Sequence, residues 1–356
     1  MTVAHRLTRH LWQRQGFWGE IGWLALIPLS LGFSALVRGR NLLYDRRWLP
    51  IKHPALKVIS VGNLTVGGTG KTPMVLWLAQ ALQHRGRQVG ILTRGYGGKN
   101  SGVTVVGTTG QALATPAAVG DEPVMLARSF AGVVICGRDR AAAAELARER
   151  FGLDVVILDD GFQHRRLARD VDLLLVNGRK GTDNGWLLPA GPLREPLAAA
   201  RRADVVIITK GSAQEHDEWP ALQALRPVFY GDLIPTALVE STQGRWHELP
   251  VEFLCGKRVV ALTGIADPVP FYRSLREWEA EVAEVLEFPD HHAYTQANWQ
   301  AISLASQKFD LIVTTEKDLV KLERFPFVTG KLVALRVRME IEQGERLLEL
   351  VEDQLS

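Results

Sequence analysis

A short run of glycines followed by a lysine and a threonine has the clearest chemical potential in the sequence. The run is GGTGKT, residues 67–72. Glycines let backbone N–H groups approach phosphate oxygens, and the start of a helix favours anions. A lysine here reaches the β- and γ-phosphates of a nucleotide, and a threonine hydroxyl binds Mg²⁺. The residues that we expect to contact nucleotide or metal are Thr65, Gly67, Gly68, Thr69, Gly70, Lys71 and Thr72.

The flanks of this run have the patterns of a strand and a helix. Lys57–Val61 is β-branched and apolar, which predicts a buried strand that ends at Gly62. Pro73–Arg85 has apolar residues at helical spacing, with proline near the first turn. Strand, glycine loop, Lys-Thr and helix together predict a P-loop. The strict P-loop pattern has glycine where this chain has Thr65, and a glycine-rich turn before an ordinary helix is the alternative.

Two carboxylates end a second apolar stretch. Val155–Leu158 predicts a strand, and Asp159 and Asp160 follow it directly. A carboxylate at the end of a strand beside the P-loop strand can hold Mg²⁺ together with Thr72. The sequence does not decide which aspartate does so, and a solvated strand end is the alternative. Gln163, three residues on, is expected to contact the nucleotide or the acceptor, or to lie in a surface turn.

Two further motifs have equally open roles. Asp121, in GDEP at 120–123, is either a helix N-cap or a general base. His291 follows an aspartate in PDHH at 289–292, which suits proton transfer near neutral pH. A capping aspartate with exposed histidines is the plainer interpretation of that segment. At Thr209–Ser212 the Asp of the guanine-reading N/T-K-x-D pattern is absent, which favours ATP over GTP.

Strand and helix patterns alternate from about residue 55 to 230. Near-continuous apolar strands between helices predict an α/β fold with a mostly parallel sheet covered on both faces. Ligands bind beyond the carboxyl ends of such strands. The other expected strands are Val89–Thr93, Val103–Val106, Val133–Cys136, Leu173–Val176 and Val205–Thr209, and the other helices are Pro123–Phe130, Asp139–Arg150 and Arg194–Arg201.

A second, smaller α/β unit is predicted after residue 230. Its expected strands are Val259–Leu262 and Leu311–Thr314, and its helices are Pro270–Glu279 and Gln296–Ser306. Residues 226–250 contain three prolines and are expected to form an irregular connection. The predicted division is therefore an N-terminal segment, 1–50, a P-loop domain, 51–230, and a C-terminal domain, 231–356.

Composition excludes several classes of protein. With 356 residues, 46% hydrophobic and 23% charged, the chain is long enough for two domains with cores. Cys136 and Cys255 lie far apart without a Cys/His cluster, which argues against structural zinc or a disulfide scaffold and fits a reducing cytoplasm. No basic stripe, zinc finger or RNP aromatics indicate a nucleic-acid partner.

The first fifty residues differ from the rest. They hold seven arginines against Glu20 and Asp45, giving +5, while the remainder carries 35 basic and 37 acidic residues, giving −2. Residues 21–37 are uncharged and mostly apolar, at the lower limit of a membrane span, and tryptophans and arginines lie around them. The segment is expected to lie in a membrane interface, to span once, or to form a buried hairpin; a signal peptide is disfavoured because no small-residue cleavage site follows.

Seven motifs together resemble one family, the tetraacyldisaccharide 4′-kinases of lipid A biosynthesis. They occur in the family's order across nearly the whole chain, and the Thr65 departure resembles the family's own loop. The combination of the P-loop with LDDGFQHR is far more specific than a P-loop alone. The motifs are GNLTVGGTGKTP (62–73), RGYG (94–97), GDEP (120–123), LDDGFQHRRLARD (158–170), LPAGPLREP (188–196), FPDHH (288–292) and TTEKD (314–318).

The resemblance implies a Mg²⁺-dependent transferase in a Gram-negative cell. It would move the γ-phosphate of ATP to the 4′-hydroxyl of a tetra-acylated glucosamine disaccharide 1-phosphate at the cytoplasmic face of the inner membrane. The N-terminal segment would associate with that membrane peripherally or as a single anchor, and we expect a monomer. A soluble P-loop regulatory NTPase acting on a protein partner is the alternative, with a soluble small-molecule kinase as a third interpretation.

The resemblance also implies roles for particular residues. The family's carboxylate–histidine pair falls on Asp121 and His291, with Asp121 accepting the proton of the sugar hydroxyl. We expect the two domains to close over ATP and acceptor to join this pair. Lys71 would hold the phosphates, and the arginines expected to neutralise phosphate charge are Arg94, Arg138 and Arg194.

Overall fold

The computed structural model describes residues 11–14, 16–211, 226–242 and 244–356. It divides into two compact units, each described by itself. Residues 2–92, 139–233 and 339–356 form the first, here called the P-loop unit, and residues 93–138 and 234–338 form the second, the companion unit. The predicted division into residues 1–50, 51–230 and 231–356 stays a prediction. Ser212 and the first ten residues lie outside the described residues.

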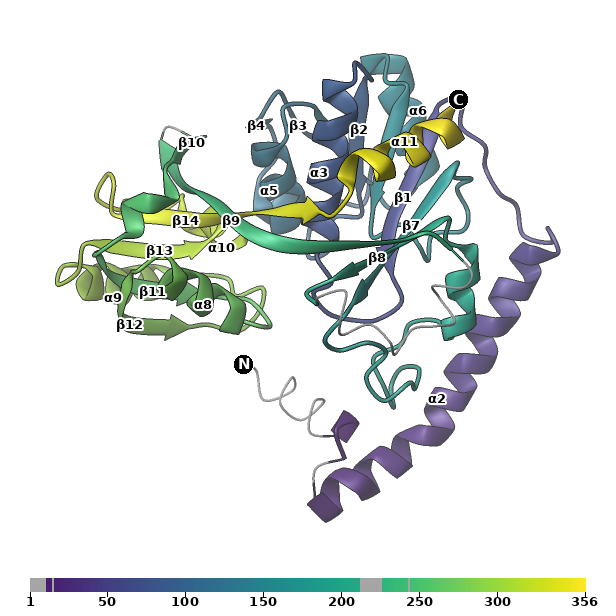
Figure 1. The fold of residues 1–356 in the computed structure, drawn as a ribbon, viewed down its shortest axis with the longest axis horizontal. Helices are drawn as coiled ribbons and strands as arrows, with labels where there is room; N and C mark the ends of the chain where they lie inside the picture. The colour runs from purple at the N-terminus through teal and green to yellow at the C-terminus, as the bar shows by residue number, and fades with distance from the viewer. Residues whose placement is uncertain (1–10, 15, 212–225, 243) are drawn as a thin grey trace. The chain divides into compact units, whose positions relative to one another are not determined.

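A parallel sheet forms the centre of the P-loop unit (Figure 1). β1 lies between β6 and β7, and β2 and β8 continue the sheet on either side. Nearly every residue of these strands is buried, as predicted for a sheet covered on both faces. The α/β fold with a mostly parallel sheet is therefore confirmed. The strands are β1 (Lys57–Asn63), β2 (Val89–Thr93), β6 (Val155–Asp159), β7 (Val171–Asn177) and β8 (Val205–Thr209).

Two predicted helices of this unit form close to their expected bounds. α3 (Lys71–His84) begins inside the glycine loop and packs against β1 and β6. α6 (Arg140–Phe151) is capped by the Asp139 carboxylate, which accepts from two backbone N–H groups. The C-terminal helix α11 (Gly344–Leu355) packs on α3, where its glutamates bond Arg85.

The predicted helix over Arg194–Arg201 is wrong. A short 3₁₀ helix, η1 (Leu197–Arg202), takes its place. Leu193 pairs with Thr65, and the Arg194 N–H donates to the Leu64 carbonyl at 2.7 Å. These contacts hold the chain extended beside the P-loop, so a helix cannot start at Arg194. Pro196 is the N-cap of η1, so the helix begins only at Leu197.

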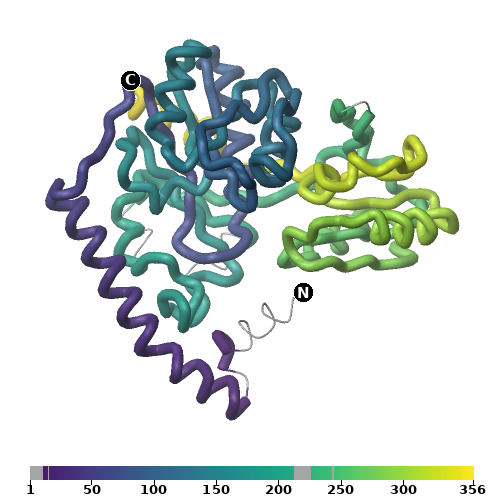
Figure 2. The backbone as a smooth tube through the Cα atoms, turned by 180° about the vertical axis from the view of Figure 1, so that it is seen from behind, coloured from purple at the N-terminus to yellow at the C-terminus, as the bar shows by residue number. Residues whose placement is uncertain are grey.

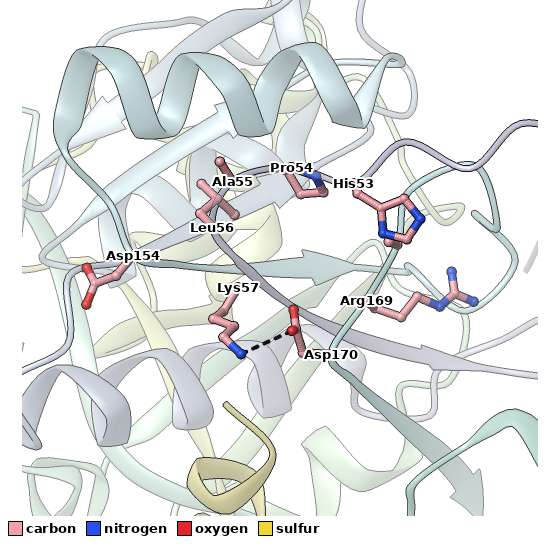
Figure 3. Close-up of a pocket in the computed structure, with 9 residues that line it drawn as sticks. His53, Pro54, Ala55, Leu56, Lys57, Asp154, Arg169 and Asp170 are labelled. Carbon is pink, nitrogen blue, oxygen red and sulfur yellow. Dashed lines mark ion pairs between the residues drawn. The ribbon is translucent and has the colours of Figure 1, made fainter. Parts of the chain in front are cut away.

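The apolar N-terminal run forms one helix, α2 (Gly16–Asp45), which continues through Pro28. Figures 1 and 2 show it running along the P-loop unit. Trp23 donates to the Ala190 carbonyl and Ser30 to the Leu187 carbonyl, so one face is docked on the loop at 187–190. The buried-hairpin interpretation is therefore wrong. Among the described residues, α2 is the helix long and apolar enough to cross a membrane.

The companion unit contains a further group of parallel strands. β11 (Arg258–Thr263) pairs with β12 (Glu281–Glu287) and β13 (Leu311–Thr315), and β13 pairs with β14 (Leu332–Ile341). The sequence did not predict β12, in which three glutamates lie among four apolar residues and exposed positions alternate with half-buried ones. The helices of this part are α8 (Val269–Glu277), α9 (Gln296–Ser306) and α10 (Glu316–Leu322).

The prediction of an irregular connection at 226–250 is wrong. β9 (Val228–Thr242) and β10 (Arg245–Leu249) are strands, and they pair in antiparallel register. Three prolines suggested a break, but Pro227 and Pro250 lie just outside the two strands and only Pro235 lies within one. Apolar residues at 237–239 are buried and hold β9 against the core.

Residues 93–138 complete the companion unit. β3 (Thr104–Thr108) pairs with β4 (Gln111–Ala112) and β5 (Val133–Cys136), both antiparallel. A short helix, α4 (Pro116–Val119), leads into α5 (Asp121–Ser129). α5 packs against α10, so a helix from the middle of the chain meets one near its end.

One glycine makes a contact that tests this fold. The predicted end of β1 at Gly62 is wrong, because β1 continues to Asn63. A Cβ at Gly62 would lie 2.5 Å from the Phe162 Cβ and 2.7 Å from its backbone nitrogen. β1 therefore runs directly against the loop that follows Asp160.

We expect Gly62→Ala to lower the free energy of unfolding by ~1–3 kcal/mol, because the backbone of Phe162 must move. Urea unfolding in detergent measures this. Gly102→Ala is the control, since a Cβ there meets nothing within 4 Å. Equal stability of the two variants would show that the contact is not tight.

Candidate functional site

The P-loop is held in place by its own side chains and by the loop at 192–194. Gly70 has φ of +83° and precedes the first residue of α3, a conformation that glycine adopts without strain. The Asn63 amide donates to the Thr69 hydroxyl at 3.1 Å, and the Lys71 ammonium donates to the Asn63 amide oxygen at 3.2 Å. The Val66 N–H bonds the Pro192 carbonyl. The P-loop is thus held by hydrogen bonds with Asn63 of β1 and with Pro192.

Asp160 joins the P-loop to two other predicted site residues. Its carboxylate lies 3.5 Å from the Lys71 Nζ and 2.8 Å from the Arg194 guanidinium. Gln163 donates to the Asn63 carbonyl at 2.8 Å, and its side-chain oxygen accepts from Arg194 at 3.4 Å. Burial alone would raise the pKa of Asp160, but the charges of Lys71 and Arg194 lower it. The carboxylate is therefore ionised at neutral pH.

Asp159 lies at the carboxyl end of β6, opposite Val61 of β1. It is buried, with 4% of its surface exposed, and Thr72 is half-buried in the first turn of α3. A hydroxyl and carboxylates are the hard oxygen donors that Mg²⁺ takes, and one or two carboxylates plus substrate phosphates suffice for it. No cluster of three or more His, Cys, Asp or Glu ligands occurs among the described residues. The donors fit a nucleotide-bridged magnesium rather than a protein cage.

The predicted carboxylate–histidine pair is formed inside the companion unit. The His291 Nδ1 lies 3.2 Å from an Asp121 carboxylate oxygen. Both residues belong to this one unit, so the expectation that closure of two domains joins them is wrong. The N-cap interpretation of Asp121 is wrong as well, because Gly120 is the N-cap and Asp121 is the first residue of α5. The carboxylate is left to face the histidine.

Charge fixes the protonation of this pair. Asp121 is 7% exposed, and burial would raise its pKa; the His291 hydrogen bond and the nearby lysines Lys317 and Lys321 instead lower the pKa to about 2. The same hydrogen bond raises the pKa of His291 above its usual value of 6.5, against the effect of burial. At neutral pH Asp121 is thus an ionised carboxylate, the form that can accept a proton.

Arg94 and Arg138 are exposed residues of the companion unit. Their contact with phosphate stays a prediction. Thr65 makes a backbone bridge with Leu193, so its part in the loop is at least structural.

Sequence reasoning missed four residues of these clusters. Asn63 links Lys71, Thr69 and Gln163, and Lys210 donates to the Gly68 carbonyl at 3.0 Å. Lys317 and Lys321 lie beside Asp121 and His291. Asn63 and Lys317 lie within motifs that carry the family resemblance, and this was the signal that could have identified them. Their sequence positions do not indicate which residues they contact.

These features define the class of the protein. A parallel α/β sheet, a glycine loop with Lys71 at the start of a helix, and carboxylates at the end of the neighbouring strand are the parts of a P-loop nucleotide-binding protein.

Comparison with known proteins identifies the family. The model of the tetraacyldisaccharide-1-P 4′-kinase family matches residues 22–356, and this chain belongs to that family. Proteins named tetraacyldisaccharide 4′-kinase are similar along most of the chain. The one from Syntrophus aciditrophicus is 39% identical, over 99% of this chain and 98% of its own, and one from Anaeromyxobacter dehalogenans is 41% identical over 93% and 91%.

A solved structure has the same fold. The crystal structure of LpxK from Aquifex aeolicus in complex with ATP matches with a TM-score of 0.79 and 33% identity. The match covers 94% of this chain and 99% of that one. The likeness therefore extends over both compact units.

The ion pair between Asp121 and His291 predicts a pH-dependent stability. Because the folded pKa of His291 is raised, the pair stabilises fully below pH 6.5, and the stabilisation is lost as pH rises through the folded value. We expect His291→Asn to lower the free energy of unfolding more at pH 5.5 than at pH 9, measured by urea unfolding. His247→Asn, at an exposed position of β10, is the control. An equal effect of His291→Asn at both pH values would contradict the ion pair.

Proposed function

We propose that this kinase transfers the γ-phosphoryl group of ATP to the 4′-hydroxyl of a tetra-acylated disaccharide 1-phosphate. Membership of the family supports the reaction class, and the names of the relatives supply the acceptor. The observation that carries the proposal is the Asp121–His291 pair in a P-loop protein. A regulatory NTPase requires the P-loop but does not require a proton acceptor for a sugar hydroxyl. That alternative is therefore not favoured.

The P-loop unit holds the nucleotide in this proposal. The backbone N–H groups of residues 67–72 and the Lys71 ammonium bind phosphate oxygens. ATP is present in the related Aquifex structure, which supports its use here. The Lys71 ammonium also contacts Asn63 and Asp160, which hold it beside the loop. Arg194, beside Asp160, is poised to neutralise charge on the transferred group.

Mg²⁺ completes the proposed phosphate site. The Thr72 hydroxyl and a carboxylate of the Asp159–Asp160 pair would hold it. When bound, the ion would neutralise charge on the phosphates, which is its general role in phosphoryl transfer. Asp160 in turn orients Lys71 and Arg194 through its two ion pairs.

Asp121 acts on the acceptor. Phosphoryl transfer passes through a loose transition state, so the hydroxyl loses its proton late and a weak base is sufficient. A carboxylate with a pKa of about 2 is fully ionised at neutral pH and ready to accept that proton. The N–H of His291 would stabilise the carboxylate and orient it toward the acceptor.

α2 provides the membrane contact in this proposal. Its outward face carries large exposed apolar side chains, and the other face is docked on the P-loop unit. We place the enzyme, as a monomer, at the cytoplasmic face of the inner membrane, because the acyl chains of the acceptor lie in the bilayer and ATP does not. The exposed side chains are Phe17, Trp18, Ile21, Leu24, Leu29, Leu31, Leu36 and Leu42.

Transfer of labelled γ-phosphate from ATP to the acylated disaccharide 1-phosphate in mixed micelles tests the reaction. We expect labelled lipid with the wild type and a turnover ~10²–10⁴-fold lower for Asp121→Ala, the usual size of a general-base contribution. Asp232→Ala, at an exposed acidic position of β9, is a matched control. Hydrolysis of ATP without labelled lipid would overturn the proposed function, and full turnover of Asp121→Ala would overturn the role of Asp121.

Flotation with liposomes tests the role of α2. We expect the triple variant Leu29→Glu, Leu31→Glu, Leu36→Glu to lose most of its membrane binding, because each substitution adds a charge on the exposed apolar face. Leu113→Glu with Leu304→Glu places charges at leucines that are 65% exposed elsewhere, and should float as the wild type does. Undiminished flotation of the triple variant would remove α2 from the membrane contact.

A further inference from the structure

A lysine that the proposed mechanism does not use lies against the far side of the His291 ring. Lys317 is the second residue of α10, and its Nζ is 3.0 Å from the His291 Nε2. Two carboxylates hold the ammonium there, Asp290 at 3.1 Å and Glu122 at 3.7 Å. The side chain is only 17% exposed. Asp121, His291 and Lys317 therefore form a row, with the imidazole in the middle.

Hydrogen-bond chemistry decides where the proton of His291 lies. An ammonium has three donors and no acceptor, so the ring nitrogen that faces it must accept. A carboxylate only accepts, so the nitrogen that faces Asp121 must donate. Both contacts are satisfied when Nε2 is bare and Nδ1 carries the hydrogen. The other neutral tautomer, and the doubly protonated ring, would each set an N–H against the ammonium.

We propose that Lys317 is a positioning residue that opposes full protonation of His291 and holds the neutral ring in the Nδ1–H tautomer, with its N–H directed at Asp121. The proposal rests on the role proposed above for the Asp121–His291 pair. It assigns a task to the TTEKD motif, whose threonine and aspartate are already accounted for by capping: Thr315 accepts from the Asp318 N–H at the start of α10.

Lys317 is built to stay charged at this position. Burial would lower its pKa, but Asp290, Glu122 and Asp121 together raise it. The charged groups that surround His291 are Asp121 and Glu122 on α5, Asp290 in its own loop, and Lys317 and Lys321 on α10. Tyr96 adds an uncharged ring at 5.9 Å.

Two opposite effects therefore act on the His291 ring. Asp121 favours its protonated form, and the charge of Lys317 opposes that form. The balance matters for the reaction, because an imidazolium beside Asp121 would draw the carboxylate's electrons and make it a poorer proton acceptor. Removal of Lys317 leaves the effect of Asp121 unopposed, so His291 becomes charged at higher pH.

Nitrogen NMR of the histidines in the full-length wild type, in detergent micelles, tests the tautomer. The His291 signals are assigned by their loss in His291→Asn. We expect at pH 8 a bare Nε2 and a protonated Nδ1. A protonated Nε2 at that pH overturns the proposal. The tautomer is read from the wild-type spectrum, and the variant serves only to assign the signals.

The pH dependence of kcat/KM with the acylated acceptor tests the consequence. In Lys317→Met the acidic limb should move by about one pH unit to higher pH, as expected for the loss of a neighbouring charge. Lys317→Arg, which keeps a charged donor, should restore the wild-type limb. Lys308→Met, at an exposed lysine after α9, is the matched control and should leave the profile unchanged.

A merely structural lysine gives a different result. Loss of activity by the same factor at every pH in Lys317→Met, or a rise in KM for ATP with an unchanged profile, would overturn the proposal. A failure of the role proposed for Asp121 is recognised separately. Full turnover of Asp121→Ala would remove that role, whereas the NMR result would still report the tautomer of His291.

Discussion

The P-loop unit depends on one shared carboxylate. Asp160 is the point at which the lysine of the P-loop, the arginine of the 187–196 loop and the end of β6 meet. Removing three charged groups from water beside a sheet costs free energy when they are unpaired. Their pairing with one another offsets that cost. The neighbouring Glu195 is fully buried and bonded to Arg202 and to Asn41 of α2. The P-loop cluster and α2 thus meet at two consecutive residues, Arg194 and Glu195.

In the companion unit the charged groups are arranged around the Asp121–His291 pair. In the proposed role a base must be ionised yet free to take a proton, and Asp121 would meet this requirement by facing a ring nitrogen of His291 that donates to it. Lysines from α10 surround the pair, and acidic residues hold those lysines in turn. α5 and α10, far apart in the chain, pack together, and this contact brings the groups within reach of one another.

Sequence patterns predicted the strands that are buried on both sides, such as Val89–Thr93 and Val205–Thr209. A short continuous apolar run is stable only where both of its faces are covered. Sequence patterns failed where tertiary pairing decides, as at β9, whose proline is tolerated, and at Arg194, which is held extended by Leu64. Of the site, the P-loop and Asp160 follow from local motifs. Asn63 and Lys317 act through partners 8 and 26 residues away, and no local pattern specifies those contacts.

The central claim is that the two units have separate tasks, nucleotide binding in one and proton acceptance in the other. Equilibrium binding of ATP with Mg²⁺, measured by calorimetry on the wild type, Lys71→Ala and Asp121→Ala, tests it most directly. The account predicts that Lys71→Ala loses most of the affinity for ATP while Asp121→Ala binds as the wild type does. Equal loss of ATP affinity in both variants would contradict it.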